Sequence, residues 1–213
     1  MSILLTGATG FVGGAVAANL ADKGLLRDTR FAVRGGTPAD GLVRLRNNLR
    51  RFQLPKTVLD GISEAQIVPF DLRNAAATAL GDPEIIINCA ALATFSNHPS
   101  LWETNVDGVL ALGRQAAQGK RLKRFLQVGT GMSCGKLADR HVQESWNVPP
   151  LEQHAVQYTY SKGMAELKLR EAYPELPLVV VRPSIVVGHS QLGCAPSGSI
   201  FWMLRMVALL ETF

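Results

Sequence analysis

The sequence has little cysteine, and its cysteines are not spaced to bind a metal or to form a set of disulfides. Only three occur in 213 residues, Cys89, Cys134 and Cys194. An odd number of cysteines without paired ligand spacing argues against a zinc site and against a disulfide-stabilised secreted domain. We therefore expect no bound metal and a reducing, cytoplasmic compartment.

Long hydrophobic runs are also missing. The apolar run from Ile3 to Leu5 is too short for a signal peptide and leads directly into a glycine turn. The apolar stretch from Ile200 to Leu210 is interrupted by Arg205 and is shorter than the roughly 20 residues that cross a bilayer. We expect no transmembrane segment, and we interpret the second stretch as a helix that packs against protein.

Neither sign of charge is in large excess. The formal net charge is +5, charged residues make up 18% of the chain and hydrophobic residues 47%, as in a folded globular protein. The densest basic cluster, Lys120 to Arg124, is typical of a solvated helix end, so we expect no nucleic-acid partner. The modest positive charge suits a ligand that carries phosphate.

The predicted elements alternate between strands and helices. Short apolar runs predict buried strands at Ile3–Leu5, Arg30–Val33, Gln66–Phe70, Glu84–Asn88, Arg124–Val128 and Leu178–Arg182. Helical patterns lie at Phe11–Lys23, Leu42–Phe52, Pro99–Gln118 and Val156–Ala172. Strands that alternate with helices pair in parallel through right-handed crossovers. The expected fold is therefore α/β, a doubly wound parallel sheet with helices on both faces.

The stretch LLTGATGFVGG contains the most specific motif near the N-terminus. Gly7, Gly10 and Gly13 follow a predicted strand and open a predicted helix, which is the context of a dinucleotide-binding turn in a Rossmann-like sheet. Free N–H groups and the helix dipole at this point favour a pyrophosphate. The residues that we expect to contact the cofactor here are Gly7, Thr9, Gly10, Phe11, Val12 and Gly13.

Arginine, and no carboxylate, stands at the end of the second predicted strand. Sites for NAD usually have Asp or Glu there to bind the ribose 2′-hydroxyl, whereas this chain has Arg34, and Asp40 comes too late. An arginine would instead pair with a 2′-phosphate, and Arg44 could be a second clamp. We predict NADP(H) as cofactor; the alternative that both arginines are ordinary surface residues stays open.

Taken in order, the motifs resemble those of extended short-chain dehydrogenases/reductases. TGATGFVG resembles the family's glycine motif, PFDL its adenine-contacting segment, and NCAA the segment beside the cofactor. TNVDG, QVGTGMSCG, the Y-x-x-x-K spacing of Tyr158 and Lys162, and VRPSIVVG follow in the family's order, so the resemblance covers residues 2 to about 192. It implies the catalytic residues Thr130, Tyr158, Lys162 and Asn105. The further cofactor contacts that it implies are Asp71, Leu72, Ala90, Ala91, Lys162, Pro183, Ser184 and Ile185.

Within that superfamily the chain is most similar to the thioester-reductase branch, which includes fatty acyl-CoA reductases. The similar stretches are FAVR with the following GLVRLRNNLRRF, NCAALATFS, and RPSIVVGHSQLG. The resemblance implies an NADPH-dependent reductase of an acyl thioester, carried on coenzyme A or a carrier protein, to an aldehyde or alcohol. Alternatives are a sugar-nucleotide epimerase, a ketone or alcohol dehydrogenase, and a non-catalytic NADP(H)-binding protein.

Tyrosine and lysine at this spacing suit carbonyl reduction. Hydride transfer leaves negative charge on the carbonyl oxygen, which needs a proton donor, and Thr130 could hold that oxygen, with Ser133 as the rival hydroxyl. A lysine four residues after a tyrosine lies on the same helix face, so Lys162 should lower the pKa of Tyr158. Tyr160 should point elsewhere and pack or face solvent.

We expect residues 1–190 to form the nucleotide-binding domain and residues 191–213 to begin a C-terminal helical substrate-binding region. The chain stops at Phe213, so we expect that region to be truncated. The aperiodic loop from Cys134 to His154 is long enough to be a lid. The four histidines share no metal or triad spacing, so we expect them in loops or at the surface. Helices on such sheets often pair two chains, which makes a homodimer one expectation.

Overall fold

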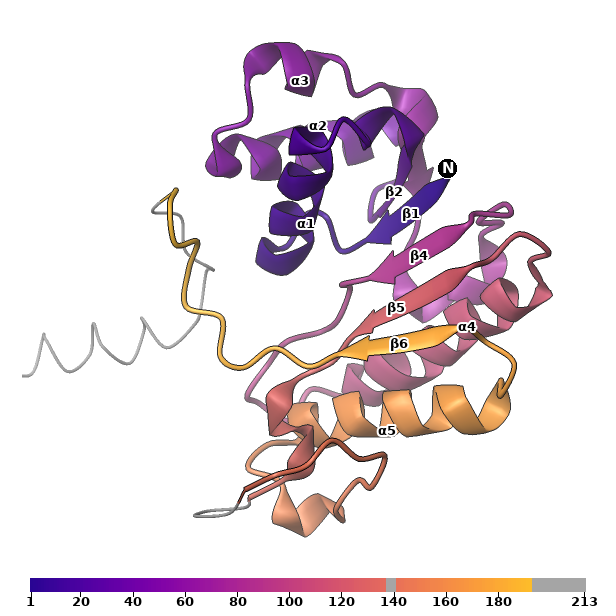
Figure 1. Ribbon diagram of the computed structural model, residues 1–213, viewed down its shortest axis with the longest axis vertical. Coiled ribbons are helices and arrows are strands. Elements are labelled where there is room, and N and C mark those ends of the chain that lie inside the picture. Colours follow the sequence, from indigo (N-terminus) through magenta and orange to yellow (C-terminus); the bar gives the residue numbers. More distant parts are fainter. Residues whose placement is uncertain (137–140, 193–213) are drawn as a thin grey trace, which may run out of the picture.

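The computed structural model describes residues 1–136 and 141–192, and in them six strands form one parallel sheet (Figure 1). The strands are β1 (Ile3–Thr6), β2 (Thr29–Val33), β3 (Ile67–Pro69), β4 (Ile85–Asn88), β5 (Arg124–Val128) and β6 (Leu178–Val181). Their order is β3-β2-β1-β4-β5-β6, which is the order of the Rossmann fold. The predicted doubly wound sheet is confirmed, and each predicted strand is present within one or two residues.

Five α-helices connect the strands within the described residues. They are α1 (Phe11–Asp22), α2 (Pro38–Leu49), α3 (Lys56–Asp60), α4 (Gly108–Gln118) and α5 (Gln157–Ala172). α2 begins earlier than the hydrophobic pattern predicts because the Thr37 hydroxyl accepts a hydrogen bond from the Asp40 N–H at 3.2 Å and Pro38 opens the first turn. A 3₁₀ turn, Arg50–Phe52, then continues the chain where the pattern predicts helix.

The predicted helix from Pro99 to Gln118 is only partly regular. A π-helical turn, Glu103–Asp107, precedes α4, and Asn105 lies inside it. The Asn105 side chain reaches back to the loop after β4: its Oδ1 accepts from the Leu92 N–H at 2.8 Å, and its Nδ2 donates to the Leu92 carbonyl at 3.1 Å. π-helical turns are rare in proteins overall, but those that occur are often found at functional sites.

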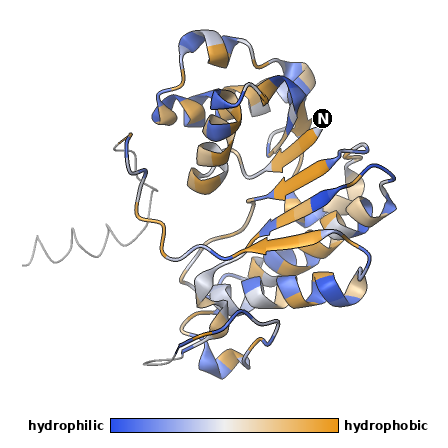
Figure 2. Ribbon diagram, in the orientation of Figure 1, coloured by the Kyte–Doolittle hydropathy of each residue, from blue (hydrophilic) through white to orange (hydrophobic). Residues whose placement is uncertain are grey.

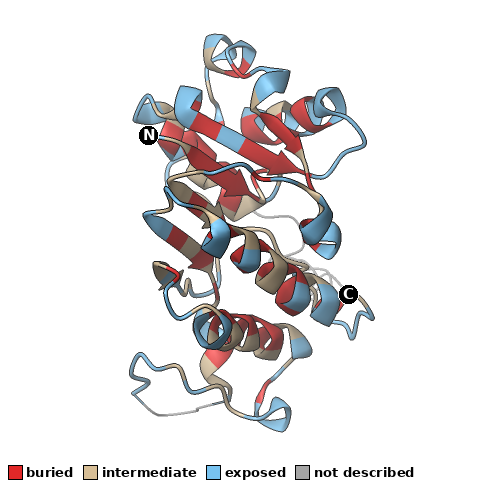
Figure 3. Cartoon of the chain, turned by 90° about the vertical axis from the view of Figure 1, so that its right-hand side faces the viewer, coloured by how far each residue is buried: buried red, intermediate tan, exposed pale blue. Residues whose placement is uncertain are grey.

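Side chains alternate between the two faces of the sheet and build two separate cores. The strands are largely hydrophobic in Figure 2 and largely buried in Figure 3. On β1, Ile3 and Leu5 face α1 and α2, whereas Leu4 faces α4 and α5. The first core also contains Ala17, Leu20, Phe31, Leu45 and Leu49, and the second contains Ile86, Val109, Leu112, Phe125 and Leu169. Because both faces of the central strands are covered, these strands are continuously apolar, which explains why they could be predicted.

The predicted C-terminal unit lies almost wholly outside the described residues. Only residues 191 and 192 of it are described, so the boundary at residue 190 and the helix at Ile200–Leu210 stay predictions. In the part of the chain that the structure describes, no helix combines the length and the hydropathy needed to cross a bilayer.

Candidate active site

A buried row of polar side chains joins the carboxyl ends of three neighbouring strands. Thr6, Asn88 and Gln127 lie in register on β1, β4 and β5, and each is fully buried. The Thr6 hydroxyl donates to the Asn88 Oδ1, and the Asn88 Nδ2 donates to the Gln127 Oε1 at 2.8 Å. These bonds satisfy polar groups inside the sheet and fix the edge at which open parallel sheets bind ligands.

The glycine turn leaves its backbone open toward this edge. Gly7 has φ +72°, and a Cβ there would stand 2.6 Å from the Ala90 nitrogen, while a Cβ at Gly13 would overlap the Gly7 carbonyl. The Gly10 N–H donates to that same carbonyl at 2.9 Å. Among the described residues no side chain caps α1, and its first turn holds no acid. The turn therefore fits the pyrophosphate of a dinucleotide.

Asn48 supports the glycine turn and was not predicted from the sequence. Its side chain on α2 is 7% exposed, and its Nδ2 donates to the carbonyls of Ala8 at 2.9 Å and Gly10 at 2.8 Å. Phe52 packs beside it, with its ring centroid 5.5 Å from that of Phe11. In the sequence, Asn48 stands out only as a polar residue on the apolar face of a helix. That pattern does not indicate that its partners are the carbonyls of the glycine turn.

Replacing Asn48 with Ala should weaken binding of a nicotinamide dinucleotide about tenfold. The change removes two hydrogen bonds to carbonyls of the turn, at about 1 kcal/mol for each hydrogen bond. Titration of the intrinsic fluorescence with NADPH and with NADH would measure the effect. Asn47→Ala is the matched control, because Asn47 is exposed and bonds only to Arg50 among its described contacts. Equal affinity in the two variants would contradict the role of Asn48.

The two predicted phosphate-binding arginines lie together at the end of β2. The Arg44 Nη1 on α2 donates to the Arg34 carbonyl at 2.7 Å, and both residues are exposed. The Asp71 carboxylate accepts from the Arg73 N–H at 3.0 Å and pairs with the Arg73 guanidinium at 2.8 Å, so these bonds hold the pKa of Asp71 below its usual value. The Leu72 side chain is 4% exposed in the core, which leaves only its backbone for a cofactor.

Tyr158 and Lys162 lie one turn apart near the start of α5. The Lys162 side chain is 2% exposed, and burial lowers its pKa to about 8. Tyr158 is half-buried, and burial raises the pKa of its phenol. Desolvation of the phenolate therefore dominates in the folded chain, and the expected lowering of this pKa by Lys162 together with the positive charge of the nicotinamide stays a prediction.

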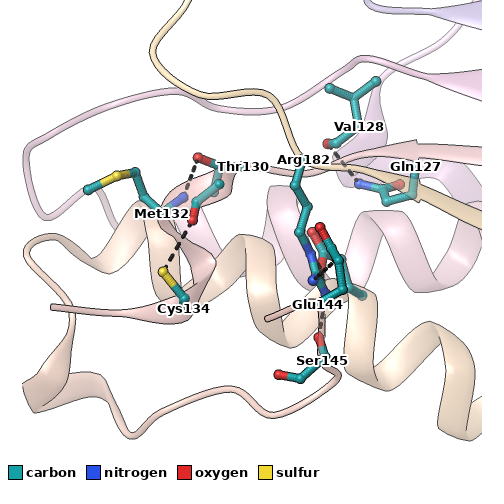
Figure 4. A network of polar contacts seen from close by, with 10 residues as sticks. Gln127, Val128, Thr130, Met132, Cys134, Glu144, Ser145 and Arg182 are labelled. Atoms are coloured by element: carbon teal, nitrogen blue, oxygen red, sulfur yellow. Dashed lines mark hydrogen bonds and ion pairs between the residues drawn. The ribbon is translucent and has the colours of Figure 1, made fainter. Parts of the chain in front are cut away.

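Thr130 lies two residues after the end of β5 (Figure 4). Its Oγ1 accepts from the Met132 N–H at 3.3 Å and caps a 3₁₀ turn, Gly131–Cys134. The Gly131 N–H donates to the Pro183 carbonyl at 2.8 Å, which holds the predicted Pro183–Ile185 segment against this turn. The rival hydroxyl, Ser133, is 6% exposed, whereas Thr130 is partly exposed. The geometry favours Thr130.

Asn105 bonds to the neighbour of Lys162. Its Nδ2 donates to the Ser161 Oγ at 3.1 Å, and that hydroxyl donates to the Tyr158 carbonyl at 2.8 Å. Its described contacts thus connect the loop after β4 with the first turn of α5 that carries Tyr158. The structure assigns Asn105 a part in placing α5, and a direct catalytic role stays a prediction.

Tyr160 packs against other aromatic rings, as its position on the helix predicts. Its ring centroid lies 6.0 Å from Trp102 and 5.4 Å from His154. His154 lies in the loop before α5, as expected, but it is buried, at 5% exposed: it contacts the Thr159 hydroxyl at 3.0 Å and the Pro149 carbonyl at 3.2 Å. The contact between His154 and Thr159 thus holds the last residue of the predicted lid loop against α5.

No group of three or more potential metal ligands occurs among residues 1–136 and 141–192.

The comparisons with known proteins agree with a reductase. A family model described as "Male sterility protein" matches residues 5–212. The chain is 29% identical over 91% of its length to "Aldehyde reductase lnaA" of Aspergillus flavus, of which it covers 20%. It is 25% identical over 87% of its length to "Fatty acyl-CoA reductase 2" of Mus musculus, of which it covers 43%.

A solved structure shows the same fold. The terminal R domain from the myxalamid PKS-NRPS biosynthetic pathway matches 96% of this chain with a TM-score of 0.76 and 26% identity. The match covers 53% of that structure, so the chain spans from about a fifth to about half of the length of these relatives.

Proposed function

The chain belongs to the male sterility protein family, and on that premise we propose that it is an NADPH-dependent reductase of acyl thioesters. The acyl group would arrive as a thioester on coenzyme A or on a carrier protein. One hydride from NADPH and one proton would break its C–S bond, giving an aldehyde and the free thiol of that carrier, and a second hydride and proton would give the alcohol. The observation that carries the proposal is that Lys162, one turn after Tyr158, faces Cys89 at the end of β4, against which the glycine turn packs, while Thr130 follows β5.

The residues present fit a nicotinamide dinucleotide. The glycine turn would hold the pyrophosphate, Arg34 and Arg44 the 2′-phosphate, and Lys162 the nicotinamide ribose. Ala90 and Pro183 lie at the carboxyl ends of β4 and β6, where they would border the nicotinamide. When bound, the cofactor supplies the hydride that reduces the carbonyl carbon.

The chain's own residues would stabilise and then neutralise the negative charge that develops on the carbonyl oxygen. The Thr130 hydroxyl would hydrogen-bond that oxygen, and Tyr158 would deliver its phenolic proton to it as negative charge develops. The raised pKa of Tyr158 keeps the phenol protonated until the transfer. The Lys162 ammonium would then stabilise the phenolate that remains.

A spectrophotometric assay tests this function. The purified chain would be mixed with NADPH and with long-chain acyl-CoA, aldehydes, ketones or a UDP-sugar, and the absorbance of NADPH would be followed. We expect oxidation with acyl-CoA and with aldehydes. Turnover of only the ketone would establish a ketone or alcohol dehydrogenase. An epimerase causes no net oxidation of NADPH, so conversion of the UDP-sugar into its epimer would be followed separately by chromatography, and that product would establish the epimerase class. Tight cofactor binding without turnover of any carbonyl would indicate a binding protein.

The choice of cofactor makes a separate prediction. Replacing both Arg34 and Arg44 with Ala should weaken NADPH binding at least tenfold and leave NADH binding unchanged, because a charged hydrogen bond to phosphate is worth about 1.5–3 kcal/mol. Dissociation constants for both cofactors would measure this. Arg27→Ala is a control, since Arg27 is an exposed arginine in a 3₁₀ turn before β2. A wild type that prefers NADH would refute the assignment.

A further inference from the structure

Glu166 is a buried carboxylate that no sequence motif singled out. Its side chain is 1% exposed and lies one turn after Lys162 on α5. A Cβ added at Gly129 would overlap the Glu166 Oε1, so the carboxylate fills the space that this glycine leaves between the helix and the end of β5. Gly129 directly precedes Thr130. Glu166 therefore lies between the predicted catalytic Thr130, just after β5, and the predicted catalytic Lys162, one turn earlier on α5.

The two carboxylate oxygens of Glu166 have different surroundings. Oε2 accepts from the Arg182 Nε at 2.9 Å and pairs with its Nη2 at 2.9 Å. Oε1 is buried and has no hydrogen-bond partner among the described residues. A buried carboxylate oxygen without a donor is unfavourable unless a nearby positive charge compensates it. The ammonium of Lys162, one turn away and equally buried, is the charge that faces it from the same helix.

Glu166 and Lys162 each favour the charged form of the other and so oppose the effect of burial on its pKa. Burial lowers the pKa of Lys162, and the carboxylate of Glu166 is the strongest influence that raises it again. Burial raises the pKa of Glu166, while Arg182 from the end of β6, and then Lys162, lower it. Cys89 at the end of β4 also faces Lys162, but burial raises the pKa of its thiol to about 12, so it brings no charge near neutral pH.

Arg182 divides its guanidinium between Glu166 and the loop before α5 (Figure 4). Its Nη1 pairs with the Glu144 carboxylate at 2.8 Å, and its Nη2 donates to the Ser145 carbonyl at 2.9 Å. The Glu144 side chain is 89% exposed, in contrast to that of Glu166. Arg182 therefore forms ion pairs with two carboxylates, Glu144 and Glu166. Of these two, only Glu166 is buried and lies one turn from Lys162.

We propose that Glu166 is a positioning residue that keeps the Lys162 ammonium charged and in place for the ribose of the cofactor. This inference rests on the proposed function only in that Lys162 contacts a nicotinamide dinucleotide. It does not depend on which carbonyl compound is reduced.

The test is the pH dependence of cofactor binding in Glu166→Gln. In the wild type, affinity for NADPH or NADH should fall as the pH rises through the pKa of Lys162, which is about 8. Without the charge of Glu166, burial lowers that pKa further, so the loss of affinity should move to lower pH by about one unit. In Glu144→Gln the profile should match the wild type, because Glu144 faces Arg182 and not Lys162.

Fluorescence titrations between pH 6 and pH 9, approximately, would give the profiles, with circular dichroism to check the fold. If Glu166→Gln does not fold, Glu166→Asp keeps the charge at a greater distance and should show a smaller shift in the same direction. A wild-type profile in a folded Glu166 variant would overturn the proposal, and so would an equal shift in Glu144→Gln. Absence of cofactor binding in the wild type would instead refute the proposed function.

Discussion

Replacing Tyr158 with Phe should reduce carbonyl turnover by about 10²–10⁴-fold and leave cofactor affinity within a factor of about two. The phenol is the expected proton donor, and general acid catalysis by a positioned side chain contributes a factor of this size. The ring itself can stay where it is, because the change removes one hydroxyl from a half-buried side chain. NADPH oxidation with acyl-CoA gives turnover, and a fluorescence titration gives affinity.

Tyr160→Phe is the matched control for this prediction. Tyr160 lies two residues further along α5 and packs against Trp102 and His154, so loss of its hydroxyl should leave turnover unchanged within about twofold. Full activity of Tyr158→Phe would rule out the proton-donor role. If the Tyr160 variant were the inactive one, the interpretation of the Y-x-x-x-K spacing would be wrong.

Replacing Gly7 with Ala should destabilise the fold by about 3 kcal/mol and abolish cofactor binding. Gly7 has φ +72°, and the left-handed conformation costs an alanine about 1–2 kcal/mol. Its Cβ would also stand 2.6 Å from the Ala90 nitrogen, and relieving such crowding in a packed site adds about 1–3 kcal/mol. The turn would have to move away from β4, which displaces the N–H groups intended for the pyrophosphate. Urea unfolding and a cofactor titration would measure the two effects.

Gly24→Ala separates backbone strain from crowding. Gly24 has φ +68°, close to that of Gly7, but a Cβ there would have no neighbour within 4 Å. We expect this variant to lose about 1 kcal/mol and to bind cofactor normally. A Gly7 variant that unfolds at the same urea concentration as the Gly24 variant, with cofactor affinity intact, would show that the close contact between the turn and β4 does not matter.

Much of the site was predictable because its motifs are local. The glycines of the turn depend on backbone conformation within a few residues, and the pairing of Tyr158 with Lys162 depends only on helical spacing. Thr130 was predicted from the resemblance of QVGTGMSCG to a motif of the family, because Arg124 and Gln127 interrupt the apolar residues of the strand before it. The alternation of strands with helices predicted a doubly wound parallel sheet, since handedness and short connections leave few ways to assemble it, but the strand order itself came from the structure.

The sequence by itself therefore determined the alternating strands and helices, and it predicted the glycine turn and the Thr130–Tyr158–Lys162 set, whose catalytic role stays a proposal. Only the tertiary structure decided which residues hold that set in place: Asn48 under the glycine turn, Asn105 against Ser161, and Glu166 between Lys162 and Arg182. It also placed Tyr158 where burial raises the pKa of its phenol. The physical reason is the same in each case. A hydrogen bond between distant residues, and the desolvation of a buried charge, depend on which surfaces meet after folding, and no local spacing encodes that.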